Sequence, residues 1–211
     1  MTELKKITIH RALTELKTLD SRIAQATRDV VLVTPHRTQN DKINNVPVEH
    51  YQKQMQGSYD KAISLIAYRN RVKDAIVQSN AVTEVVVAGE TMTVAKAIER
   101  KESIKYEESL YATLYRQFRE ANAVVNRADE EMPKKLETYL VNILGNREKA
   151  SAEDIKLHTE AFTKMNKVEL IDPMGAEKIL QALNENIIAF KADVDATLSE
   201  SNATTFIEIE A

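Results

Sequence analysis

The side chains best able to do chemistry in this sequence are its four histidines and its many carboxylates. None of the histidines has Asp or Glu three residues before it, so the Glu-x-x-His pairs that hold a di-iron centre in a helical bundle are absent. Asp154 and His158 lie one helical turn apart and form the only metal-binding pair worth weighing. Two ligands make a weak site, and a solvated helix pair is the favoured interpretation. We therefore expect no metal and no cofactor.

The glycines and the missing cysteines exclude nucleotide hydrolysis by glycine-loop folds and all thiol chemistry, and the sequence has no recognisable serine-nucleophile motif. The four glycines stand too far apart to form a Gly-x-Gly-x-x-Gly or Walker loop, and no Gly-x-Ser-x-Gly occurs. The chain has no cysteine, which removes zinc ribbons, iron-sulfur clusters, disulfides and thiolate nucleophiles. Acidic runs such as Glu107-Glu108 fall on polar helix faces, where no carboxyl group is desolvated for acid–base work. We assign no catalytic residue and expect a protein that is not an enzyme.

Two basic clusters raise nucleic-acid binding as an alternative. They are formed by Arg69, Arg71 and Lys73, and by Arg116 and Arg119. Such binding combines basic charge with exposed aromatic rings, whereas the aromatic residues near the second cluster share the apolar stripe of a predicted helix and favour core packing. Arg69 and Arg71 are expected to pair with acidic residues of that same helix. The net charge of −3 provides no overall field that would attract nucleic acid or an anionic membrane.

The polar segment from Thr34 to Val46 is the best candidate for specific recognition. Long polar loops on a rigid helical framework commonly carry binding residues. The side chains expected to make contact are His36, Arg37, Asn40 and Lys42. A loop without a function is the open alternative, and the acidic C-terminal strand could instead pair with the sheet of a neighbouring subunit.

Several long helices must position these residues. The chain has only four glycines and four prolines among 211 residues, well below their usual combined share of about 12%. Apolar residues spaced three and four apart predict the helices, and β-branched or alternating runs predict the strands. The predicted helices cover about 9–28, 47–79, 94–128, 133–145, 152–166 and 173–199, and the predicted strands cover about 30–33, 82–87 and 204–210.

Two local patterns occur twice in the chain. Thr8-Ile-His-Arg-Ala-Leu13 matches Thr93-Val-Ala-Lys-Ala-Ile98, and Ser79-Asn-Ala-Val-Thr83 matches Ser201-Asn-Ala-Thr-Thr205. We infer two helical-hairpin units, each entered through a Thr cap and left through Ser-Asn-Ala into a strand. The alternative is that capping chemistry repeatedly selects these residues. The predicted fold is mainly α: a single domain over 1–211, an elongated antiparallel bundle of long helices, with a small sheet formed by a hairpin and the C-terminal strand.

The segment Val85-Val-Val-Ala-Gly-Glu-Thr-Met-Thr-Val-Ala-Lys-Ala-Ile-Glu-Arg100 resembles the central part of small helical bacterial proteins of the septicolysin family. The opening Ile7-Thr-Ile-His-Arg-Ala-Leu-Thr-Glu-Leu-Lys-Thr-Leu-Asp20 more closely resembles uncharacterised proteins encoded by phages and prophages of Gram-positive bacteria. These resemblances imply a helical architecture and a viral context, without a catalytic site.

We therefore expect a phage structural or assembly protein that acts through protein–protein contacts. Its expected partners are copies of itself or viral structural proteins, with no membrane, in the bacterial host cytoplasm or the virion. No apolar run has the length of a signal peptide or membrane span. A phage-encoded regulatory or counter-defence protein that binds a host protein is the second hypothesis, and a nucleic-acid-binding helical protein is the third.

Overall fold

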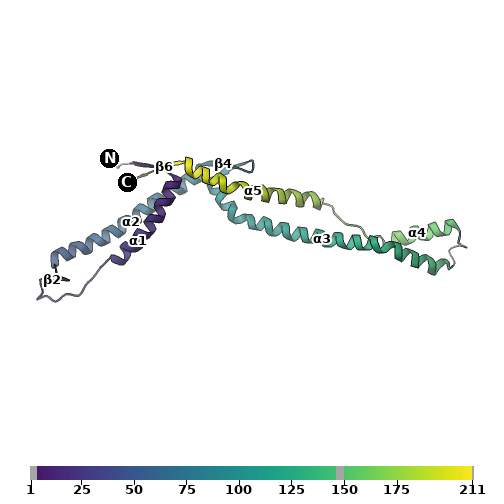
Figure 1. Ribbon diagram of the computed structural model, residues 1–211, viewed down its shortest axis with the longest axis horizontal. Coiled ribbons are helices and arrows are strands. Elements are labelled where there is room, and N and C mark those ends of the chain that lie inside the picture. Colours follow the sequence, from purple (N-terminus) through teal and green to yellow (C-terminus); the bar gives the residue numbers. More distant parts are fainter. Residues whose placement is uncertain (1–3, 146–149, 211) are drawn as a thin grey trace. The chain divides into compact units, whose positions relative to one another are not determined.

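The computed structural model describes residues 4–145 and 150–210 and is mainly α-helical, as the sequence predicts (Figure 1). The chain divides into two compact units. Unit 1 comprises Met1–Glu102 and Ala189–Ala211, and unit 2 comprises Ser103–Ile188. The prediction of a single domain over 1–211 is not tested by this division.

Unit 1 contains a helical hairpin of α1 (Ile9–Asp29) and α2 (Val48–Val82), close to the predicted limits. Thr8 caps α1, because its hydroxyl accepts a hydrogen bond from the backbone N–H of Arg11 at 3.3 Å. Apolar side chains spaced three and four apart on each helix face the other helix and form one continuous core. The buried helical residues of this core are Ile9, Ala12, Leu16, Leu19, Ala26, Ala62, Leu65, Val72 and Ile76.

The strands form separate two-stranded antiparallel sheets, so the prediction of one shared sheet is wrong. Strand β6 (Phe206–Glu210) pairs with β1 (Leu4–Thr8), which the sequence analysis did not predict, and Ile7 lies opposite Ile207. The hairpin strands β4 (Glu84–Val87) and β5 (Glu90–Thr93) pair only with each other. Strand β6 can complete its ladder with β1 because Ile7, Ile207 and Ile209 together join the α1–α2 core.

The predicted strand over 30–33 is also absent: within the described residues, these positions have no regular secondary structure and pair with no strand. Instead, β2 (Lys42–Ile43) and β3 (Val46–Pro47) form a short hairpin just before α2. Asn44 and Asn45 make its turn with positive φ angles of 49° and 64°. Asparagine tolerates this left-handed conformation, which a two-residue hairpin turn requires.

Unit 2 is built mainly from α3 (Val94–Leu144), which begins in unit 1, and α4 (Ala152–Asn166). The predicted break between 128 and 133 is wrong, because α3 continues through Pro133. Proline removes one backbone hydrogen bond of the helix, but the residues before Pro133 include good helix formers and no glycine, and the helix continues through it. Helix α5 (Ala176–Thr204) starts three residues after the predicted position and returns the chain to unit 1.

The two repeated sequence patterns form equivalent junctions in unit 1. The N–H of Ile9 donates to the carbonyl of Thr205 at 2.9 Å, and the N–H of Val94 donates to the carbonyl of Thr83 at 2.9 Å. At the ends of α2 and α5, Thr83 and Thr205 each donate to the carbonyl of the serine four residues earlier. The predicted junctions are confirmed, and each lies where a two-stranded sheet meets its helices.

Side-chain contacts repeat at the same positions with their charges reversed. Lys5 pairs with Glu15 at 2.8 Å, and Glu90 pairs with Arg100 at 2.8 Å, each pair separated by ten residues in the sequence. Unit 1 therefore consists of two strand–helix–helix–strand halves: β1, α1, α2 and β4, followed by β5, the start of α3, the end of α5 and β6. Unit 2 is inserted within the helices of the second half.

A glycine pair provides a test of the helix and turn assignments. Gly57 lies inside α2 with open space where a Cβ would be, whereas Gly89 has a φ of +82° in the β4–β5 turn. We expect Gly57→Ala to raise the free energy of unfolding by about 0.5–1 kcal/mol. Gly89→Ala should lower it by about 1 kcal/mol, because an L-residue is strained at that φ. Urea unfolding followed by circular dichroism measures both, and a stabilising Gly89→Ala would contradict the assigned turn.

The contacts of Glu15 predict a pH-dependent stability of unit 1. Burial raises the pKa of Glu15, but hydrogen bonds from Lys5 and from the Tyr68 hydroxyl at 2.8 Å outweigh it, and the net pKa is lowered. A carboxyl group with a lowered folded pKa stabilises the fold above its unfolded pKa, and this contribution is lost as the pH falls through the folded value. Between pH 6 and pH 3, the urea midpoint should therefore fall more in the wild type than in Glu15→Gln. The control is Glu49→Gln on an exposed position of α2, which should follow the wild type.

Candidate binding site

The predicted recognition residues all lie exposed around the tip of the α1–α2 hairpin. His36, Arg37 and Asn40 belong to the irregular chain between α1 and β2, and the N–H of Asn40 donates to the carbonyl of Arg37 at 2.9 Å. Lys42 lies in β2, opposite Pro47. Their role in binding stays a prediction.

Asp154 and His158 are engaged with separate partners. The carboxylate of Asp154 accepts a hydrogen bond from the Ser151 hydroxyl at 2.6 Å, at the start of α4. The Nδ1 atom of His158 lies 3.3 Å from the Tyr139 hydroxyl of α3, and Tyr139 packs on Phe162. Across the described ranges, no group of three or more His, Cys, Asp or Glu side chains is placed to hold a metal ion. The contacts of Tyr139 with His158 and Phe162 hold α4 against α3.

The predicted partners of the first arginine cluster are wrong. Arg69 pairs with Asp20 of α1 at 3.3 Å, and Arg71 donates to the backbone carbonyl of Glu210 at 3.3 Å. Both therefore bind elements of unit 1 that are adjacent to α2, rather than acidic residues of α3. In unit 2, Arg116 lies 3.6 Å from Glu120, and the Arg119 guanidinium lies over the Tyr115 ring. These arginines are occupied by contacts within each unit.

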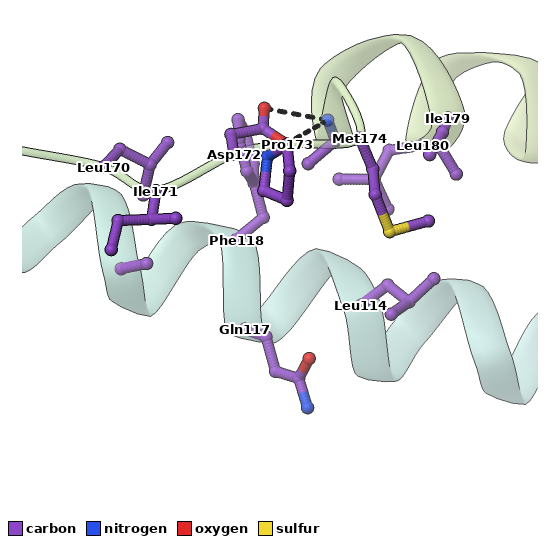
Figure 2. A pocket seen from close by; sticks show the side chains of 12 residues that line it. Leu114, Gln117, Phe118, Leu170, Ile171, Asp172, Pro173, Met174, Ile179 and Leu180 are labelled. Atoms are coloured by element: carbon purple, nitrogen blue, oxygen red, sulfur yellow. Dashed lines mark hydrogen bonds between the residues drawn. The ribbon is translucent and has the colours of Figure 1, made fainter.

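Unit 2 contains an apolar groove with a cavity volume of about 290 Å³. One wall is α3, and the other is the extended chain before α5 together with the first turns of α5 (Figure 2). The lining residues are Leu114, Gln117, Phe118, Ala121, Leu170, Ile171, Asp172, Pro173, Met174, Ala176, Ile179 and Leu180.

Asp172 fixes the chain that forms the second wall of this groove. Its carboxylate accepts hydrogen bonds from the backbone N–H groups of Gly175 and Ala176, both at 2.9 Å (Figure 2). A carboxylate at this position also interacts favourably with the positive, N-terminal end of the α5 helix dipole. Asp172 is the only charged residue of the lining, and its carboxylate is bonded to the start of α5. The rest of the lining is mostly apolar.

Side chains at the mouth of the groove are strongly exposed. Ile171 is 92% exposed and Met174 is 76% exposed, while Leu180 on the floor is buried. Methionine adapts its shape to different apolar partners. The mostly apolar lining is suited to an apolar group.

Sequence reasoning placed Asp172 and Pro173 at a helix start but did not identify the groove. The available signal was the apolar content of Val168-Glu-Leu-Ile171 directly before that start. An apolar run of this kind indicates a segment that packs against another element. The sequence does not show which element, because the facing residues of α3 lie some fifty positions earlier in the chain.

Comparison of the chain with protein-family models, with curated proteins and with solved structures finds no match. Within the described ranges, no helix has both the length and the apolar character needed to cross a membrane.

Two methionines of similar exposure test whether the groove binds apolar groups. Met174 lies in the groove, whereas Met165, which is 83% exposed, lies on α4 outside it. We expect Met174→Glu to weaken binding of an apolar fluorescent dye at least fivefold, because a carboxylate at the mouth disfavours apolar ligands. Met165→Glu should leave the dissociation constant unchanged. Fluorescence titration measures both, and equal effects of the two substitutions would exclude the groove as the dye site.

Proposed function

We propose that this chain is a non-enzymatic assembly protein of a bacteriophage, either a virion component or an assembly factor, that acts through protein–protein contacts. The observation that carries the proposal is the amount of apolar surface left uncovered. In the part of the chain that the structure describes, 26 large apolar or aromatic side chains are exposed, against 23 buried hydrophobic residues. Large uncovered apolar areas are typical of surfaces that bind other proteins.

The exposed side chains are grouped, which supports specific contacts rather than scattered exposure. On α2, Tyr59, Ile63 and Ile66 follow helical spacing on a face distinct from the buried Ala62 and Leu65. In unit 2, the residues at the mouth of the apolar groove form a second group. The first group lies on α2, which is anchored by buried core residues, so a partner would meet a preformed surface there.

The phage context rests on the resemblance of residues 7–20 to phage and prophage proteins. An assembly role agrees with the absence of a recognisable catalytic motif in the sequence, because assembly requires surfaces and not a reactive centre. The proposed partners are other structural proteins encoded near the same gene, together with further copies of this chain.

Binding to the products of neighbouring genes tests this proposal. We expect at least one of them to bind the full chain with micromolar or tighter affinity in a pull-down followed by calorimetry. Met174→Glu should weaken that binding at least fivefold if the partner uses the groove, and Met165→Glu serves as the matched control. A chain that stays monomeric at high concentration by light scattering, and that binds none of these proteins, would contradict the proposal.

A further inference from the structure

The chain directly after α1 has the properties of a β-strand but lacks a strand to pair with. Val31, Leu32 and Val33 form a β-branched and apolar run without regular secondary structure, and Leu32 and Val33 are 74% and 82% exposed. None of the three makes a backbone hydrogen bond within the described residues. An exposed run of this kind favours addition to a sheet edge.

Strand β4 offers such an edge. The bond between the N–H of Val94 and the carbonyl of Thr83 fixes the ladder of the β4–β5 hairpin. Because hydrogen-bonded pairs alternate along an antiparallel ladder, the backbone groups of Glu84 and Val86 point away from β5. Neither residue makes a backbone hydrogen bond to another described residue on that side.

A groove runs beside this edge and has the polarity that a strand backbone requires. It has a cavity volume of about 330 Å³ and lies between β4 and the last turns of α5. The α5 side carries several hydroxyl groups; those of Thr197 and Thr204 already donate within α5, and their oxygens can still accept from peptide N–H groups. The lining residues are Thr83, Glu84, Val85, Val86, Thr197, Glu200, Ser201, Thr204 and Thr205.

The charges of the two segments are complementary. The groove carries Glu84 and Glu200, whereas His36 and Arg37 follow the exposed apolar run. A strand that enters the groove would bring these basic residues towards the two carboxylates. Pro35 cannot donate a backbone hydrogen bond, so it limits the strand to the residues before it.

The two segments cannot meet within one chain. The apolar run follows the C-terminal end of α1, and β4 follows the C-terminal end of α2. Tyr68 and Arg71 near that end of α2 contact Glu15 of α1 and the terminal strand β6, so β4 lies near the start of α1. The 21 residues of α1 span about 30 Å, which separates the apolar run from the β4 edge.

We infer that Val31–Val33 of one copy of this chain adds as a third strand to the β4 edge of a second copy. This inference rests on the proposed assembly function and names a second copy as the partner at this edge. The contact joins different surfaces on the two copies, and it can therefore build closed rings or longer chains. Backbone hydrogen bonds supply the attraction, and the charges around the groove set the direction.

Cysteine cross-linking tests this contact directly, because the chain contains no cysteine of its own. Leu32→Cys and Val86→Cys are prepared separately and mixed under oxidising conditions. We expect a disulfide-linked dimer from the mixture at several times the yield obtained with Leu32→Cys and Val124→Cys. Val124 is the matched control, since it is 60% exposed on α3 and Val86 is 57% exposed. Equal yields with Val86 and Val124 would overturn the inference.

Proline substitution provides a second measurement, because the two variants change an exposed segment that belongs to no helix or strand. In an edge strand, alternate N–H groups face the partner strand. One of Leu32→Pro and Val33→Pro should therefore reduce the oligomer mass measured by light scattering, while the other retains it and both keep the wild-type circular dichroism. If oligomers form but both or neither variant changes their mass, this inference is wrong and the assembly function stands. A strictly monomeric chain that still binds neighbouring gene products would also refute this inference alone.

Discussion

Unit 1 depends on closing each strand–helix junction with backbone hydrogen bonds. A short strand that runs directly into a helix leaves the first helical N–H groups without partners. At both junctions, the first of these groups donates to a threonine carbonyl at the end of another helix, from Ile9 to Thr205 and from Val94 to Thr83. These bonds connect segments that are distant in sequence, and they fix the register of each two-stranded sheet. The helical hairpins then start from a defined position.

Around these junctions, the two halves keep the same positions of their side-chain contacts but exchange the signs of the charges. Glu15 meets Lys5 and the Tyr68 hydroxyl, and the equivalent Arg100 meets Glu90 and lies over the Phe190 ring. In each half, a charged side chain of the first helix contacts both a residue of the preceding strand and an aromatic ring of the second helix. Cation–π attraction in one half replaces a hydrogen bond in the other. Such replacement at corresponding positions is more than capping preferences alone require, and it supports the interpretation of two related halves.

Local sequence patterns predicted those features that depend on local chemistry. The helix limits of α1, α2 and α4 and the repeated junctions follow from apolar spacing and caps, which neighbouring residues determine. The pairing of β1 with β6 could not be read in this way, because β1 contains one buried residue, Ile7, and its partner lies at the other end of the chain. The run at Val31–Val33 has strand propensity but pairs with no strand among the residues that the structure describes. The apolar groove of unit 2 likewise joins segments far apart in sequence.

The insertion of unit 2 explains why the second half carries surfaces that the first lacks. In the first half, α1 ends at Asp29, and an irregular connection that includes the β2–β3 hairpin leads to α2. In the second half, α3 continues far beyond the junction, and the chain returns along it through Leu170–Met174 before α5 begins. A returning segment without regular structure cannot cover a helix face as fully as a second helix does, so apolar residues of α3 remain accessible in the groove. The first half instead leaves its apolar run in the connection itself. The apolar run of the first half and the apolar groove of the second thus both involve the chain that connects the two helices of that half.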